Sequence, residues 1–132
     1  LHLLDLTART RQPILERVPW PNTMAWAPNG AWLAFTVTNR AEGAGLYVFA
    51  PEDRSLRQVR LPKGATEKAV FWADMEHLFV IRQGTASSAT ELWIVSLTSG
   101  EAQRIITNVE APLPDVYNGW RWQDVLAMQA IR

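Results

Sequence analysis

Short apolar runs alternate along the chain with turns that contain Pro, Gly, Asn and Ser. The runs are rich in Val, Ile, Phe, Trp and Tyr, the residues that favour β-strands. The turns carry strand breakers such as Pro28-Asn29-Gly30 and Thr98-Ser99-Gly100. No stretch has a helical periodicity long enough to predict a helix. Away from the chain ends, the predicted strands are residues 24–27, 32–38, 46–50, 56–61, 69–73, 78–82, 92–97 and 102–107.

The predicted strands repeat with a period of about 46 residues. Trp26 aligns with Trp72 at an offset of 46, and residues 45–48 align with residues 91–94 at the same offset. The opening Leu3-Leu4-Asp5-Leu6-Thr7 matches Ile94-Val95-Ser96-Leu97-Thr98 at about two periods. Segments that share one offset indicate an internal repeat with four strands in each unit.

The composition of each strand predicts its position in a sheet. Trp32-Leu33-Ala34-Phe35 and Leu46-Tyr47-Val48-Phe49 are apolar on both faces, so their sheet must lie between two other layers. The last strand of the unit, residues 56–60, mixes charged and apolar residues, which is typical of an exposed edge. We therefore predict an all-β fold, a β-propeller of four-stranded antiparallel blades with a period of about 46 residues. We expect Trp26 and Trp72 to be buried between neighbouring blades.

A family resemblance agrees with this fold. Residues 26–35, Trp-Ala-Pro-Asn-Gly-Ala-Trp-Leu-Ala-Phe, resemble the W-S-P-D-G-x-x-L-A-F signature of TolB-type (WD40-like) propeller repeats. Residues 45–49, Gly-Leu-Tyr-Val-Phe, resemble the strand that follows the signature in that family. The second unit departs from the pattern, because Asp74-Met75-Glu76 replaces the Pro-Asn-Gly turn. Such repeats occur in periplasmic assembly factors, in lipoproteins and in the non-catalytic domain of prolyl-oligopeptidase-type peptidases.

Counting strands from a, nearest the propeller axis, to d gives about three blades' worth of chain. Residues 1–15 form a half-blade with strands c and d, and residues 16–61 and 62–107 each form one blade. Residues 108–132 form a half-blade, with strand a at 117–122 and strand b at 125–131. Closed propellers have about 4–8 blades, so three cannot close a ring. The expected partner is therefore a second copy, in a homodimer with six blades, or the missing blades of a longer parent chain.

Composition narrows the function. Thirteen Lys and Arg balance thirteen Asp and Glu, which argues against a nucleic-acid partner. No apolar run approaches the length of a membrane span. Zero cysteines and two histidines exclude thiolate metal sites and His-rich metal sites. We expect no metal and no cofactor.

The sequence predicts a protein that is not an enzyme. It contains no Gly-x-Ser-x-Gly, no His-Glu-x-x-His and no glycine-rich phosphate loop. His77 and the paired Glu52-Asp53 fall in predicted turns, where exposed charges are ordinary. Nothing in the sequence therefore forms a general acid–base pair.

Binding is expected at the loops around the channel mouth, where the d–a and b–c connections meet. Trp20, between two prolines, is a candidate to anchor a ligand if its side chain is exposed, whereas packing over the core between blades is the favoured role. Its candidate polar companions are Arg40, Glu42, Asp115 and Arg121.

We interpret the chain as a non-enzymatic binding or scaffold propeller that presents loops to a protein or a small ligand. One alternative is a fragment of the gating propeller of a prolyl-oligopeptidase-type peptidase. Another is a glycan-binding propeller, which the lack of Trp or Tyr in residues 62–68 and 108–115 disfavours. The resemblance favours a periplasmic or other extracytoplasmic location, and the lack of cysteine is equally compatible with the cytoplasm.

Overall fold

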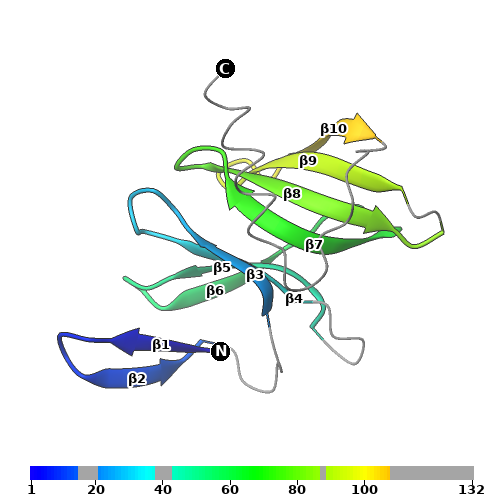
Figure 1. Ribbon diagram of the computed structural model, residues 1–132. Helices are drawn as coiled ribbons and strands as arrows, with labels where there is room; N and C mark the ends of the chain where they lie inside the picture. The colour runs from blue at the N-terminus through cyan, green and yellow to red at the C-terminus, as the bar shows by residue number, and fades with distance from the viewer. Residues whose placement is uncertain (15–20, 38–42, 87–88, 108–132) are drawn as a thin grey trace.

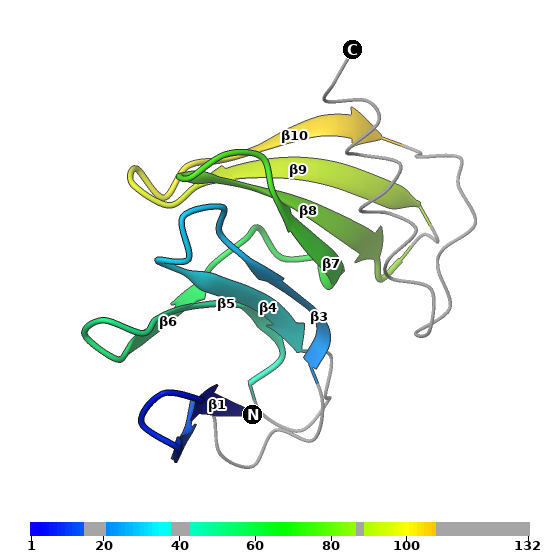
Figure 2. The same ribbon diagram turned by 60° about the vertical axis from the view of Figure 1, so that its left-hand side comes forward.

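The computed structural model describes residues 1–14, 21–37, 43–86 and 89–107. These residues form antiparallel β-sheets joined by turns, and they include no helix long and apolar enough to cross a membrane. Two four-stranded sheets lie beside each other, and a two-stranded hairpin lies on the far side of the first sheet (Figures 1 and 2). The all-β class predicted from the sequence is therefore confirmed.

The first sheet contains β3 (Pro21–Trp26), β4 (Leu33–Val37), β5 (Gly45–Ala50) and β6 (Ser55–Val59), in sequence order. Every residue of β4 and β5 is buried, as two-sided apolar strands require. The outer strand β6 is mostly exposed, as its mixed composition predicts. At the β3–β4 turn, Gly30 adopts a φ of 72° and donates its N–H to the Ala27 carbonyl at 2.8 Å.

The second sheet repeats this order with β7 (Ala65–Trp72), β8 (His77–Gly84), β9 (Thr90–Ser96) and β10 (Ala102–Thr107). The strand pairs place equivalent residues at equivalent positions. Trp26 pairs with Leu33, and Leu33 with Phe49, in the first sheet. Trp72 pairs with Leu78, and Leu78 with Val95, in the second. The sequence repeat is therefore also a repeat of sheet register.

The N-terminal hairpin consists of β1 (His2–Asp5) and β2 (Thr10–Pro13). Its turn matches the β5–β6 turn, because Arg9 and Arg54 both adopt a left-handed backbone, with φ of 53° and 59°. Gly100, at the same place in the β9–β10 turn, has a φ of 75°. Each of the three turns therefore places one residue in the left-handed region shortly before the outer strand.

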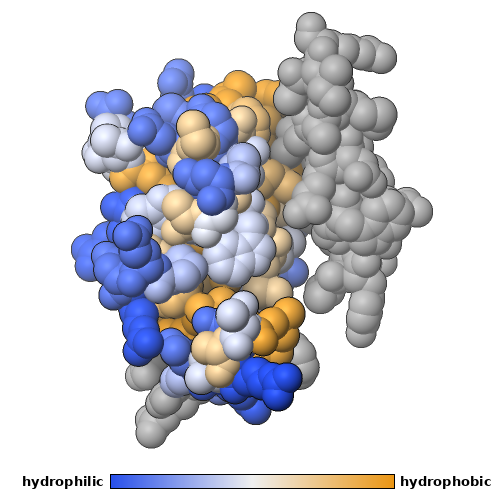
Figure 3. Space-filling model, turned by 90° about the vertical axis from the view of Figure 1, so that its left-hand side faces the viewer, coloured by the Kyte–Doolittle hydropathy of each residue, from blue (hydrophilic) through white to orange (hydrophobic). Residues whose placement is uncertain are grey.

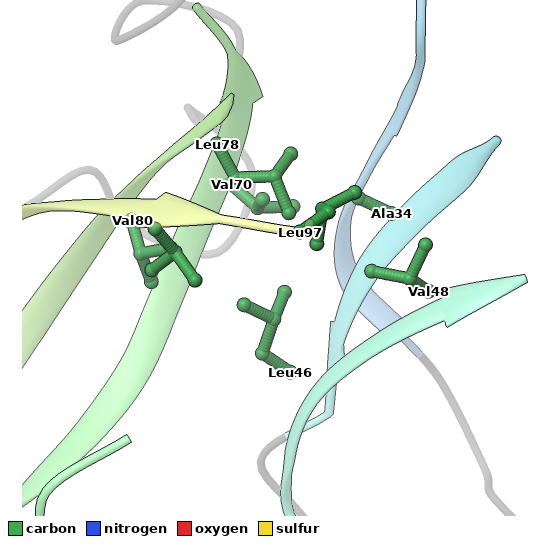
Figure 4. Close-up of a cluster of buried hydrophobic side chains, with 8 residues drawn as sticks. Ala34, Leu46, Val48, Val70, Leu78, Val80 and Leu97 are labelled. Atoms are coloured by element: carbon green, nitrogen blue, oxygen red, sulfur yellow. The ribbon is translucent and has the colours of Figure 1, made fainter. Parts of the chain in front are cut away.

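The main core fills the space between the two four-stranded sheets. Leu46 and Val48 of the first sheet face Val70, Leu78 and Val80 of the second, and Figure 4 shows these side chains pointing toward one another. Ala34, Val95 and Leu97 complete the fully buried set. Apolar burial contributes about 25 cal/mol per Å², so this layer holds the sheets together.

A second core lies on the opposite face of the first sheet. Phe35, Val37 and Tyr47 are buried there, together with Leu33 and Phe49. Three apolar residues in or next to the N-terminal hairpin pack against this cluster: Leu1, Leu3 and Ile14. The Phe35 and Tyr47 rings stack with centroids 5.5 Å apart.

One of the two tryptophan predictions is wrong. Trp72 is partly buried between the sheets and packs against the main core. Trp26, its equivalent in the first sheet, has 48% of its surface exposed. The physical reason is that Trp72 meets the inner strand β3 of the neighbouring sheet. Among the described residues, the N-terminal hairpin supplies only outer strands to the face that carries Trp26.

Candidate functional site

The ligand residues predicted from the sequence lie outside the described residues. This holds for Trp20, Arg40, Glu42, Asp115 and Arg121, and also for the strands predicted at 117–122 and 125–131. The described part of the chain does, however, contain a groove at one end of the two four-stranded sheets. There the β3–β4, β5–β6, β7–β8 and β9–β10 turns gather.

This turn-end groove has a volume of about 620 Å³ and lies between the two four-stranded sheets. Figure 3 views the molecule from the turn end, where apolar residues reach the surface between hydrophilic side chains. Both sheets contribute to the groove, so its shape depends on how the sheets pack. Its lining residues are Asn29, Trp32, Ser55, Arg57, Met75, Glu76, Leu97 and Thr98.

Arg57 is the positive charge in the turn-end groove, and two contacts hold its guanidinium. Its Nη2 donates a hydrogen bond to the Leu97 carbonyl at 2.9 Å, across the interface between the sheets. The guanidinium carbon also lies 5.8 Å from the centre of the Trp32 ring, within cation–π range. Since a guanidinium has five N–H donors, a ligand carboxylate can still bind it.

A smaller hollow of about 240 Å³ continues along the same interface, with Arg57 and Leu97 shared between the two cavities. It runs beside the outer strand β6 toward the β9–β10 turn, and includes Arg60 and Gly100. The two cavities together give the interface an elongated shape, which suits a peptide better than a compact metabolite.

The sequence predicts the elements around this groove but not the groove itself. Asn29 is predicted as a turn residue, and its Oδ1 accepts a hydrogen bond from the Ala31 N–H at 3.0 Å. Trp32 and Arg57 are predicted in an inner and an outer strand. The contact between them depends on the packing of side chains at the sheet ends, and strand spacing does not encode it.

Asp74 and His77 form a polar pair in the β7–β8 turn, beside the turn-end groove. The Asp74 carboxylate accepts hydrogen bonds from the backbone N–H groups of Glu76 and His77, at 2.7 and 2.8 Å. The Glu76 N–H is the largest cause that lowers the pKa of Asp74, and the His77 ring adds to the effect. The Asp74 carboxylate therefore stabilises its own turn. It is not suited to act as a general acid, because a general acid needs a raised pKa.

A buried charge cluster lies at the other end of the second sheet. The Arg82 guanidinium donates hydrogen bonds to the Pro62 and Ala65 carbonyls and lies 5.1 Å from the centre of the Trp93 ring. Its Nε is 3.3 Å from Glu67 Oε1, without the alignment of a hydrogen bond. The cluster therefore holds the β6–β7 connection against the second sheet. Arg82 is buried, so a ligand cannot reach it.

Glu91 extends this cluster toward the surface. Its carboxylate accepts hydrogen bonds from Trp93 Nε1 at 2.8 Å and from Arg104 at 3.0 Å. The Trp93 N–H is the largest cause that lowers the pKa of Glu91, and the positive charge of Arg104 acts in the same direction. In the described part of the chain, no three acidic or histidine side chains gather closely enough to hold a metal ion.

Comparison with known proteins gives a likeness of fold. No protein-family model matches the chain, and no curated protein matches it. Among solved structures, a "putative conserved lipoprotein" from Clostridium novyi NT is similar, with a TM-score of 0.52 and 19% sequence identity. The likeness covers 75% of this chain and 68% of the Clostridium novyi protein. At this level of identity the two proteins share an all-β arrangement, and no shared activity follows.

Proposed function

We propose that this chain is a segment of a TolB-type β-propeller and acts as a non-enzymatic binding platform. Support for the propeller comes from two consecutive sheets with the same strand order and register. Support also comes from the contact between their first strands, β3 and β7, which a shared propeller axis requires. Residues 16–61 and 62–107 are then its two complete blades.

The turn-end groove is the observation that carries the binding function. It combines a fixed guanidinium at Arg57 with the apolar side chains of Trp32 and Met75. Aromatic, methionine and arginine side chains are the types enriched at protein interfaces. The ligand that fits is a peptide segment with a carboxylate for Arg57 and an adjacent apolar side chain for Trp32. Glu76 and Thr98 can accept hydrogen bonds from the peptide N–H groups.

Selection of peptides on the immobilised chain tests this function. From a phage library of random short peptides, we expect enrichment of sequences that place Asp or Glu next to an apolar residue. Arg57→Ala removes the charge and should abolish the enrichment, whereas Arg57→Lys keeps the charge and should retain part of it. Lys63→Ala, an exposed change outside the groove, is the control and should select the same peptides as the unchanged chain. Circular dichroism verifies that each variant folds.

Two outcomes would refute peptide binding at the turn-end groove. One is a selection in which no sequence rises above the background of the empty surface. The other is recovery of the same acidic peptides on Arg57→Ala, since binding would then occur elsewhere.

We also propose that the platform lies outside the cytoplasm. The family resemblance favours this location, and the Clostridium novyi protein of similar fold is described as a lipoprotein. Fractionation of cells that express the parent gene, followed by immunodetection of this chain, tests the location. Recovery in the cytoplasmic fraction alone would contradict it.

A further inference from the structure

The smaller hollow beside the turn-end groove borders the edge of the first sheet. β6 is the last strand in the order of that sheet, and Figure 2 shows it at the outer edge. Four consecutive residues, 57–60, line the hollow. Since side chains alternate between the two faces of a strand, a wall made of consecutive residues includes the main-chain edge of the strand. Within the described residues, this edge of β6 has no strand partner.

The pairing of β6 is regular, unlike that of the outer strand in the second sheet. All five residues of β6 pair with β5 in unbroken register. β10 instead carries an irregularity between Arg104 and Ile106, and a bulge of this kind bends a strand and interrupts its ladder of hydrogen bonds. Proteins use such bulges to prevent an edge from pairing with another chain. Of these two outer strands, β6 is therefore the one suited to extend its sheet.

The edge of β6 is also positively charged. Arg57 lines both cavities, and Arg60 lines the smaller hollow. The ion pairs within the described part of the chain involve neither arginine. Residues that face each other on neighbouring strands lie about 5 Å apart, and opposite charges at such positions attract. Charge on an edge strand repels strands of like charge, so a strand that pairs with β6 must be acidic.

We propose that the peptide ligand binds as an added strand along the edge of β6, with acidic side chains next to Arg57 and Arg60. The occupant is an extended acidic segment of another protein. In this mode, main-chain hydrogen bonds supply affinity and alternate side chains supply specificity. The turn-end groove, which shares Arg57 with the smaller hollow, receives the segment beyond the end of β6. This inference rests on the proposed peptide binding and adds the conformation and charge of the ligand.

The first test asks whether the ligand binds as a strand. The probe is a fluorescein-labelled octapeptide, Gly-Thr-Val-Glu-Leu-Glu-Thr-Gly, titrated with the full chain in fluorescence anisotropy. A series of variants carries one N-methyl group at each successive residue, which removes that N–H donor. In a strand, only alternate N–H groups point toward the neighbouring strand. We therefore expect affinity to fall at least about tenfold at alternate positions, because a main-chain hydrogen bond is lost there, and to change little at the positions between them.

The second test asks whether the edge selects acidic residues. Arg60→Ala should weaken binding of the octapeptide about threefold, the value of one cross-strand pair of opposite charges. Lys63→Ala is the matched control, because Lys63 is an exposed basic residue a little further along the chain that lines neither cavity. It should leave the affinity unchanged. A second peptide, with Gln in place of both Glu, should bind more weakly and should lose no further affinity to Arg60→Ala.

The third test locates the added strand on the chain by amide hydrogen exchange. With the octapeptide bound, we expect protection to increase at alternate residues of β6. The amides of β10, the bulged outer strand, should keep their exchange rates and provide the internal control.

The outcomes separate this inference from the proposed function. Uniform effects of N-methylation, unchanged exchange in β6, or no binding of the octapeptide at millimolar concentration would each overturn strand addition. Selection of peptides that depend on Arg57 would still support the groove in those cases. Equal affinity of Arg60→Ala and the unchanged chain would overturn the assignment of Arg60. A peptide selection in which nothing is enriched would refute the proposed function itself.

Discussion

The indole nitrogen of Trp72 donates a hydrogen bond to the main-chain carbonyl of Ala25, at 2.8 Å, across the interface between the two four-stranded sheets. The bond joins the innermost strands β3 and β7. At the outer edge of the interface, Arg57 donates to the Leu97 carbonyl. These polar contacts fix the angle and register of sheets whose apolar core is non-directional.

Replacement of Trp72 separates the hydrogen bond from the packing. Trp72→Phe keeps a ring but removes the N–H, and should lower the free energy of unfolding by about 1 kcal/mol. Trp72→Ala also removes the aromatic surface, and should cost about 3 kcal/mol or more. Urea denaturation measures both values. Equal losses in the two variants would mean that the ring contributes little to packing.

The sheet order was predictable because it follows from local pattern. Residues 46–50 carry apolar side chains on both faces, while residues 56–60 mix charge into the strand. Burial then matches composition, with β5 buried throughout and β6 mostly exposed. Hairpin turns between consecutive strands connect neighbours in the sheet, so their order needs no long-range information.

The environment of Trp26 was not predictable in the same way. Its repeat position is that of Trp72, but burial depends on a neighbouring sheet and not on the strand itself. The turn-end groove is not predicted from the sequence for a similar reason, since it forms only where the two sheets pack and Arg57 of the first sheet reaches the Leu97 carbonyl beside the second. Spacing along the chain therefore predicts strands, while contacts between units require the three-dimensional arrangement.

Removal of the buried guanidinium should destabilise the fold strongly. Arg82→Met leaves Glu67 without its ion pair and frees the Pro62 and Ala65 carbonyls. Loss of one partner of a buried pair typically costs about 3–5 kcal/mol. We expect a loss near the lower end in urea denaturation, because Glu67 retains some exposure.

Two further variants make the Arg82 prediction specific. The double change Arg82→Met with Glu67→Gln removes the orphaned charge and should recover part of the lost stability. Arg104→Met is the control, because Arg104 forms an exposed ion pair with Glu91 that is worth less than about 1 kcal/mol. Equal effects of Arg82→Met and Arg104→Met would contradict the buried role.

The carboxylate of Glu91 should make stability depend on acid pH. Hydrogen bonding from Trp93 Nε1, and secondarily the charge of Arg104, hold the pKa of Glu91 below its ordinary value of 4.5. A lowered folded-state pKa contributes stability that is fully present above the unfolded value and is lost as pH falls through the folded value. The loss should therefore begin below a pH of about 4.5.

Thermal unfolding of the unchanged chain and of Glu91→Gln, between neutral and strongly acid pH, measures this contribution. Glu91→Gln should have a lower Tm at neutral pH and a shallower decline in acid, because it cannot take up the proton. Glu101→Gln, a change in the exposed β9–β10 turn, serves as the control. Parallel Tm curves for the unchanged chain and Glu91→Gln would exclude the assigned role.

The proposed absence of catalysis predicts that a fluorophosphonate probe labels no serine in the folded chain. In the described residues, Ser96 Oγ and Ser99 Oγ accept backbone N–H hydrogen bonds within their own turn. Neither hydroxyl has a hydrogen bond to histidine in this part of the chain, so neither has an adjacent base. Mass spectrometry after incubation with the probe provides the measurement. Stoichiometric labelling of any serine would overturn the non-enzymatic assignment.

Arg54 offers a prediction of increased stability. It adopts a left-handed backbone with a φ of 59° in the β5–β6 turn, where Gly100 occupies the equivalent position of the β9–β10 turn. A non-glycine residue in this region costs about 1–2 kcal/mol of backbone strain. A change to glycine relieves this strain, but the greater chain entropy of glycine in the unfolded state offsets part of the gain. Arg54→Gly should therefore raise the free energy of unfolding by about 0.5–1 kcal/mol.

The reverse change, Gly100→Ala, should lower the free energy of unfolding. The added methyl group would not clash with the protein, because no atom lies within 4 Å of a Cβ at this position. Urea denaturation of both variants measures opposite shifts if backbone strain is the cause. A loss of stability in Arg54→Gly would mean that the arginine side chain stabilises the turn by more than its backbone strain.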